Sequence, residues 1–404
     1  MSASASASSS KVASTPILLC RYQLMAPRNP SGFSSLAPEI LHMILTQASI
    51  TTTDLLSFCH VSSALRPLAQ EILWKDVSLG NLQAIKSWSR ITIRRPELGA
   101  RSRALHLTLP PFAEFTPADI KTISRALNKC INLDSLSLDR SPDASMNSNF
   151  IYVLLGRPFR LRCFTNRYCT IESLSPFFEQ QQSIQTLNLQ PTKETIPASL
   201  IPSVRSIIMP PTSIRTYFPD HDAHTTSTGI THVHVYLDGY YDVWWRWERR
   251  LFGQHITSLS IRTNGFWFPP NYSSLAISSL AQHLPALLQF RLIDQSGIEY
   301  IEDHREMPSI SLQSQTLKVF AFICDAYHSG HDCIYDALRT EERRMEMARR
   351  IFSECQTLDV VVLGHNHRLL RSASDTITTI SISEEDVDQL MAAKHPSDLR
   401  AIIV

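Results

Sequence analysis

Short apolar segments of one spacing recur along most of the chain. In each segment an apolar residue is followed three positions later by a second one and five positions later by a third, and in most segments a polar or small residue separates the last two. A period of two is typical of a strand that buries one face. Ten such segments begin at Ser102, Leu133, Leu161, Ile184, Val204, Ile230, Ile256, Leu287, Leu317 and Leu358. The pattern therefore predicts ten strands, with Ser102 and Asn166 as polar exceptions.

The spacing of these segments indicates how the strands assemble. Their first positions lie 20 to 41 residues apart, mostly close to the range of leucine-rich repeats. A single strand of this kind cannot bury its apolar face alone, so neighbouring repeats must stack into one core. Helical patterns over 117–130, 273–283 and 335–355 would supply the outer row. Residues 80–404 thus resemble an irregular leucine-rich-repeat solenoid, which implies an α/β fold.

Residues 35–79 have a different, helical pattern. Pro38 suits the first turn of a helix, where its missing N–H is not needed. Asp54 follows three threonines, one of which can cap a second helix. A third helical segment over 64–74 leads into a short strand over 76–79, and Pro67 would kink this helix unless it lies in the first turn. The apolar stripe expected on the first helix consists of Ile40, Leu41, Ile44 and Leu45.

Four short motifs in this region resemble the F-box. They are Leu36-Ala-Pro-Glu-Ile-Leu41, Asp54-Leu-Leu56, Val61-Ser-Ser-Ala-Leu65 and Ile72-Leu-Trp74. Their order and spacing over about 45 residues follow the family pattern, although Ala37 replaces the commoner first proline. An F-box followed by irregular leucine-rich repeats is similar to the large fungal F-box families, including those of basidiomycetes.

The resemblance implies a non-catalytic substrate-receptor subunit of a Skp–cullin–RING ubiquitin ligase, which binds the Skp linker protein and a protein target. It implies action in the cytoplasm or nucleus, without a cofactor. A scaffold whose F-box serves another assembly is the alternative. The residues expected to bind Skp are Leu36, Pro38, Glu39, Ile40, Leu41, Ile44, Leu45, Leu55, Leu56, Val61, Leu65 and Trp74. The same apolar positions could instead form the core of a three-helix module, and so small a module cannot bury all of them.

Target recognition is expected on the repeats, at the strand-lined concave face and its loops. The candidate contact residues are His232, His234, Trp245, Arg249 and Arg291. The two histidines occupy polar strand positions expected to face solvent, as do Asp134, Ser137, Gln185, Asn188, Ser260, Arg291 and Lys318. Residues 240–252 are dense in aromatic and arginine side chains, which dominate interface hot spots. Packing of a repeat helix onto its strands would account for one face of that segment equally well.

Enzymatic motifs are sparse. The chain has only 11 glycines and no glycine-rich phosphate loop, G-x-S-x-G or H-E-x-x-H. Gly364-His-Asn-His367 follows an apolar strand and resembles the last metal motif of calcineurin-like phosphoesterases, but the chain offers no D-x-H strand or G-N-H-[DE] loop to complete a two-metal site. A metal-dependent hydrolase is therefore the less favoured reading. We expect a loop after the tenth strand, and no bound metal.

Composition narrows the class of partner and compartment. The 38 basic and 37 acidic residues give a net charge of +1, so nothing attracts nucleic acid or an anionic membrane overall. No apolar run is long enough to span a bilayer, and eight cysteines without a C-x-x-C motif favour reduced thiols. Residues 1–34 form a Ser/Ala-rich tail expected to be disordered. Their lack of acidic residues also fits a mitochondrial transit peptide, but Pro16, Pro27 and Pro30 would interrupt its helix.

Overall fold

The structure is a computed structural model of the 404-residue chain. It describes residues 36–46, 50–61, 63, 65–189, 196–209, 229–237, 255–263, 284–294, 316–324, 340–364, 367–371 and 377–381. The chain divides into two compact units, Met1–Gln181 and Gln182–Val404. This division lies inside the predicted repeat region, and not at its start near residue 80.

The first unit begins with three helices, α1 (Pro38–Leu45), α2 (Thr52–Val61) and α3 (Leu65–Lys75). Helix α3 continues directly into strand β1 (Asp76–Leu79). Because α3 begins at Leu65, Pro67 lies in its first turn, where a missing N–H costs no helical hydrogen bond. The helices and the short strand predicted over 35–79 are therefore present.

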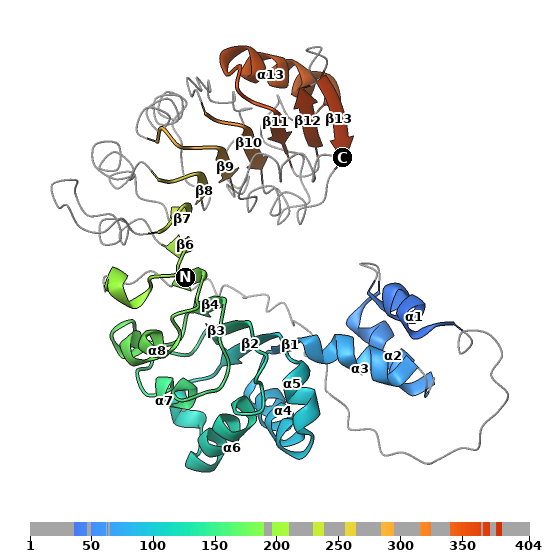
Figure 1. The fold of residues 1–404 in the computed structure, drawn as a ribbon, viewed down its shortest axis with the longest axis vertical. Coiled ribbons are helices and arrows are strands. Elements are labelled where there is room, and N and C mark those ends of the chain that lie inside the picture. Colours follow the sequence, from blue (N-terminus) through green and yellow to red (C-terminus); the bar gives the residue numbers. More distant parts are fainter. Residues whose placement is uncertain are drawn as a thin grey trace, which may run out of the picture. The chain divides into compact units, whose positions relative to one another are not determined.

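Four parallel strands form the sheet of the first unit, and they follow one another in sequence order (Figure 1). After β1 come β2 (Ala104–Leu109), β3 (Ser135–Arg140) and β4 (Cys163–Asn166). Between the strands lie α4 (Leu82–Arg94), α5 (Pro96–Arg101), α6 (Pro117–Leu127) and α7 (Ile151–Leu154), and α8 (Ser175–Gln180) follows β4. Helix α6 confirms the helix predicted over 117–130.

Register between the strands stacks their apolar side chains. Leu105 lies opposite Leu136, and Leu136 lies opposite Phe164; all three are almost fully buried. Phe164 continues the stack onto α8, where its ring centre lies 4.8 Å from that of Phe177. Each strand thus buries its apolar face against its neighbours and the helices, as a repeated unit requires.

The second unit continues this scheme with seven parallel strands, again in sequence order. They are β5 (Thr186–Leu189), β6 (Ser206–Met209), β7 (His232–Leu237), β8 (Ser258–Thr263), β9 (Gln289–Asp294), β10 (Val319–Cys324) and β11 (Val360–Leu363). Two antiparallel strands follow, β12 (His367–Arg371) and β13 (Ile377–Ser381). Helix α13 (Glu341–Glu354) lies within the helix predicted over 335–355, whereas 273–283 lies outside the described residues.

All ten predicted strands are confirmed, as β2 to β11. Asn166, a polar exception to the pattern, is explained by the turn that follows β4. Its Oδ1 atom accepts the N–H of Cys169 at 2.8 Å, and its Nδ2 atom donates to the carbonyl of the same residue at 2.7 Å. The side chain is buried because it completes this turn. The fold is therefore α/β with mainly parallel strands.

One backbone arrangement recurs from repeat to repeat. We call the residue immediately before each parallel strand the lead residue. At Arg103, Asp134 and the second-unit lead residues from Gln185 to Lys318, its carbonyl accepts hydrogen bonds from two successive N–H groups of the next repeat, as Asp134 does from Arg162 at 2.7 Å and Cys163 at 3.0 Å. The carbonyl of Lys75 accepts one such bond, from Arg103. Lead residues of the first unit are Lys75, Arg103, Asp134 and Arg162, and those of the second are Gln185, Arg205, Thr231, Thr257, Leu288, Lys318 and Asp359. Within each unit these bonds fix the stagger of successive strands.

Candidate functional site

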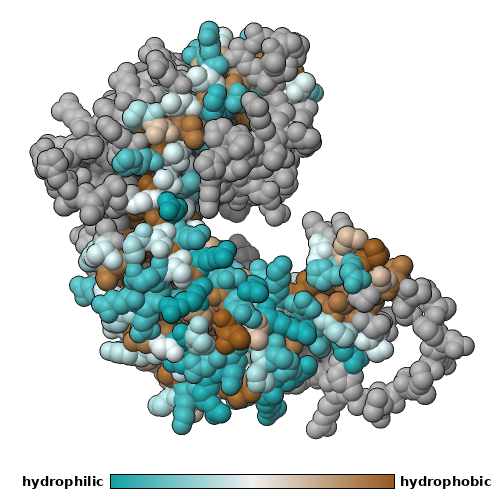
Figure 2. Space-filling view, viewed as in Figure 1, coloured by the Kyte–Doolittle hydropathy of each residue, from teal (hydrophilic) through white to brown (hydrophobic). Residues whose placement is uncertain are grey.

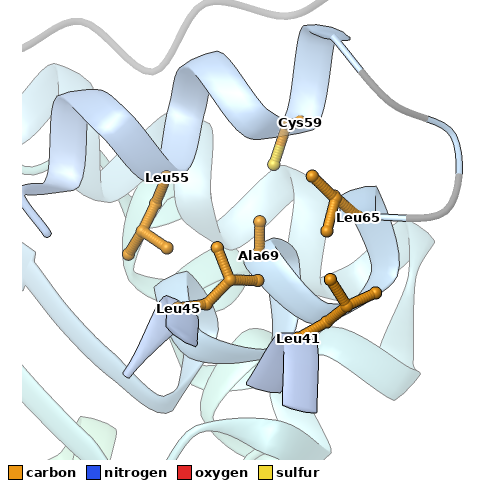
Figure 3. Close-up of a cluster of buried hydrophobic side chains, with 6 residues drawn as sticks. All are labelled: Leu41, Leu45, Leu55, Cys59, Leu65 and Ala69. Carbon is orange, nitrogen blue, oxygen red and sulfur yellow. The ribbon is translucent and has the colours of Figure 1, made fainter. Parts of the chain in front are cut away.

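The three-helix module has its own small core, shown in Figure 3. Leu41 and Leu45, one turn apart on α1, point into it and are only 4% and 3% exposed. The remaining members are Leu55, Cys59, Leu65 and Ala69. Residues that hold the module together in this way offer almost no surface to a partner.

A second stripe on α1 remains at the surface. Leu36, just before the helix, is 39% exposed, Ile40 is 40% exposed and Met43 is 55% exposed. Ile40 and Met43, three positions apart, lie on one side of α1, next to the stripe that is buried, and Leu36 precedes the helix by two positions. We call these three residues the α1 apolar stripe. Figure 2 shows apolar surface gathered on this module. Met43 was not among the residues expected to bind Skp, although its spacing of three positions from Ile40 indicates the same side of the helix.

Ten of the twelve residues expected to bind Skp occupy three environments. Leu41, Leu45, Leu55 and Leu65 are buried in the core of the module. Ile44, Leu56 and Trp74 are half-buried, whereas Leu36, Glu39 and Ile40 are exposed. The side chains of Pro38 and Val61 lie outside the described residues. Only the exposed and half-buried members can contact a partner without unfolding the module.

Local hydrogen bonds hold α2 and α3, the two helices against which α1 packs. Thr51 donates its hydroxyl and its backbone N–H to Asp54 Oδ2, at 2.7 Å and 2.9 Å, and Asp54 returns its N–H to the threonine hydroxyl at 3.2 Å. This reciprocal cap begins α2. The same side-chain and backbone hydrogen bonds from Thr51 lower the pKa of Asp54. Arg66 joins α3 to the end of α2 by donating its Nε–H to the carbonyl of Cys59 at 2.9 Å.

In the first unit, the sheet face turned away from the apolar core carries mostly small polar side chains. His106 Nε2 on β2 lies 3.5 Å from Asp76 Oδ1 on β1. Ser137 on β3 donates its hydroxyl to Asp139 at 3.0 Å, and Arg167 lies 3.6 Å from the same carboxylate. Ser137 was expected to face solvent, but it is buried by this local network. The charged groups on this part of the face are therefore largely engaged with one another.

The same face in the second unit becomes progressively more buried along the chain. His232 and His234 on β7 are half-buried, and they lie opposite Ser258 and Ser260 on β8. Arg291 on β9 is only 8% exposed and donates its Nε–H to Ser260 Oγ at 3.0 Å. Ser260 and Arg291 were expected to face solvent, and this part of the prediction is wrong because side chains on both faces of β8 and β9 are buried.

The other candidate target contacts, Trp245 and Arg249, lie outside the described residues. So does His365, the first histidine of the proposed metal motif. His367 begins β12 and pairs with Leu363 at the end of β11, so Gly364-His-Asn connects two antiparallel strands. Gly364 has a φ of 70°, which suits such a tight connection. Among the described residues, no three His, Cys, Asp or Glu side chains gather as a metal site would require.

Comparison with known proteins provides no further assignment, because no protein-family model and no curated protein matches the chain. Within the described part of the chain, no helix is both long enough and apolar enough to cross a membrane. The candidate functional surface therefore rests on geometry, and the α1 apolar stripe is its most distinct part.

Proposed function

We propose that the protein is a substrate-receptor subunit of a Skp–cullin–RING ubiquitin ligase. The observation that carries this proposal is the α1 apolar stripe on a three-helix module with F-box-like motifs, joined directly to a repeat sheet. Three large apolar side chains that stay exposed on a short helix and just before its start are typical of a surface that a partner covers. Skp is the partner that the order of the motifs indicates.

The division of roles follows from the two parts of the chain. The helical module would dock on Skp, and the repeats would hold the target. Such a receptor makes and breaks no bond itself. It would raise the effective concentration of the target near the ubiquitin-loaded enzyme, so that transfer proceeds as a near-intramolecular step.

The test compares two sets of exposed apolar residues in the full chain. Ile40→Glu/Met43→Glu introduces charge into the α1 apolar stripe, and Ile131→Glu serves as matched control because Ile131 is similarly exposed, at 54%, outside the module. Binding to purified Skp is measured by calorimetry, and circular dichroism verifies folding. We expect the double variant to bind at least about thirtyfold more weakly, a loss of about 2 kcal/mol. The control should bind as the wild type does.

Unchanged binding by a folded Ile40→Glu/Met43→Glu variant would contradict the assignment of the stripe. Leu41→Ala/Leu45→Ala is a poorer test, because both leucines belong to the core of the module. Skp binding without recruitment of a cullin would favour the alternative of a scaffold outside a ligase.

A further inference from the structure

The lead residues form a row along the edge at which the parallel strands begin. In the first unit they are bonded directly in sequence: Arg103 N–H donates to Lys75, Asp134 N–H to Arg103, and Arg162 N–H to Asp134, at 2.7 to 2.8 Å. Adjacent strands lie about 4.8 Å apart, so the four residues extend over roughly 14 Å.

Side chains of neighbouring lead residues reach one another. Arg103 Nη1 lies 3.4 Å from Asp134 Oδ2 in the first unit, and Lys318 Nζ lies 3.7 Å from Asp359 Oδ2 in the second. The same relation in two distant repeats indicates that lead side chains gather at this edge. All of these ion pairs are substantially solvent-exposed, so they contribute little to stability.

The two units differ in the charge of this row. In the first unit three of the four lead residues are cationic, Lys75, Arg103 and Arg162, against a single acidic residue, Asp134. In the second unit four of the seven are uncharged, Arg205 is cationic, and Lys318 and Asp359 pair with each other. The row therefore has a net charge of +2 over four residues in the first unit, against +1 over seven residues in the second. Lys75 and Arg162, at its two ends, are both exposed.

We infer that this basic row is a docking surface for an acidic, extended segment of the target protein. An extended peptide advances about 3.4 Å per residue, so roughly four residues would cross the row. Carboxylate side chains of such a segment could meet Lys75 and Arg162 at the ends of the row. Asp134 interrupts the row, and the net charge of the chain is only +1, which disfavours a continuous polyanion such as nucleic acid. The inference rests on the proposed function, because it specifies the chemistry of the target.

The test measures binding of a fluorescent hexaglutamate peptide to the full chain by anisotropy, at low salt and without Skp. Lys75→Glu/Arg162→Glu should weaken binding about tenfold or more, and Lys75→Gln/Arg162→Gln by a smaller factor. Arg205→Glu is the matched control, because Arg205 is an exposed lead residue of the second unit; it should change binding less than twofold. Hexaglutamine should not compete.

Absence of hexaglutamate binding, or equal weakening by Arg205→Glu, would overturn the inference. Tighter binding of an oligodeoxythymidylate than of hexaglutamate would assign the row to nucleic acid instead. Skp binding, measured separately on the same variants, should persist in both double variants. The peptide-binding experiment thus tests the docking surface, whereas the Skp-binding experiment tests the proposed ligase role, so either hypothesis can be rejected separately.

Discussion

The phenol of Tyr168 donates a 2.9 Å hydrogen bond to the carbonyl of Pro110, 58 positions earlier in the chain. This bond ties the turn after β4 to the end of β2, and Tyr168 is fully buried. Its ring also packs edge-on against that of Phe150, with ring centres 5.5 Å apart. Tyr168 therefore joins segments of several repeats at one point.

Replacement of this phenol should lower stability in a pH-dependent way. Tyr168→Phe leaves the Pro110 carbonyl without its partner, and we expect a loss of about 1 to 2 kcal/mol in the free energy of unfolding at neutral pH. Burial, followed by the neighbouring Cys169 and Glu114, raises the pKa of Tyr168 above its ordinary value of about 10. The neutral phenol thus contributes fully below about pH 10, and the contribution is lost as pH rises towards the raised pKa.

Urea unfolding at pH 7.5 and pH 10.5 tests this prediction, with the exposed Tyr152→Phe as control. The difference between the wild type and Tyr168→Phe should narrow at the higher pH, whereas Tyr152→Phe should match the wild type at both. A difference that is independent of pH would contradict the role assigned to the phenol.

Gly99 marks a close approach between α5 and its neighbours. An added Cβ would lie 2.7 Å from Thr92 Cγ2 and 3.1 Å from the carbonyl oxygen of Lys129, too close for either to remain in place. We expect Gly99→Ala to lower the free energy of unfolding by about 1 to 3 kcal/mol. Gly80→Ala is the control, since nothing lies within 4 Å of its added Cβ. Equal melting temperatures of the two variants would refute the predicted clash.

Two buried serines should respond differently to the same substitution. Ser102 occupies a position that is apolar in the other nine segments, and its hydroxyl finds no hydrogen-bond partner among the described residues. Ser102→Ala should therefore leave stability unchanged or raise it by up to about 1 kcal/mol. Ser137→Ala removes the hydrogen bond to Asp139 and should lower stability by about 1 to 2 kcal/mol. Chemical denaturation of both variants checks the order, and the reverse order would contradict it.

Thiol labelling should distinguish Cys163 from the buried cysteines. Cys163 is exposed on β4, whereas burial raises the pKa of Cys130 and of Cys169 to about 12. The thiolate is the reactive form, so a maleimide should label Cys163 rapidly and these two only after unfolding. Peptide mapping by mass spectrometry provides the measurement, with Cys163→Ser as control. Rapid labelling of Cys130 in the native protein would be inconsistent with its burial.

The strands could be predicted from the sequence because the alternation of apolar and polar residues within a strand involves only residues close together in the chain. Leu136 and Leu138 alternate with Ser137, and the strand they form buries the two leucines against the helices. Within each unit, the apolar positions of the pattern lie opposite one another in successive strands, with Asn166 as the exception. Val319, Ala321, Val360 and Val362 occupy positions that are mostly polar in earlier repeats, and all four are buried. That change indicates strands covered on both faces.

The solvent exposure of the polar strand residues could not be predicted from this alternation. Alternation assigns Ser260 and Arg291 to the face opposite the core, but it does not determine whether other parts of the chain cover that face. Such covering depends on contacts between residues far apart in sequence. The half-buried His232 and His234 illustrate the same limit, because their strand pattern resembles that of the exposed positions in β1.

On α1, the sequence does not indicate which of two neighbouring apolar stripes is buried. Ile40 and Leu41 are adjacent in sequence and equally apolar, yet Ile40 is 40% exposed and Leu41 is 4% exposed. Only the packing of α2 and α3 determines which stripe is inside. Helical periodicity alone therefore predicts a single apolar stripe, which contains both core residues such as Leu41 and surface residues such as Ile40.

The paired backbone hydrogen bonds at the lead residues have a consequence for how such a chain can diversify. Within a unit, each step from one strand to the next is aligned by hydrogen bonds between main-chain atoms, which every sequence possesses. The segments that connect successive strands therefore need not contribute to this alignment. The segment between β5 and β6 is short, whereas that between β10 and β11 is more than twice as long, and both steps have the same two bonds. Insertions in the connections, or duplication of a whole step, would therefore preserve the alignment of the remaining strands.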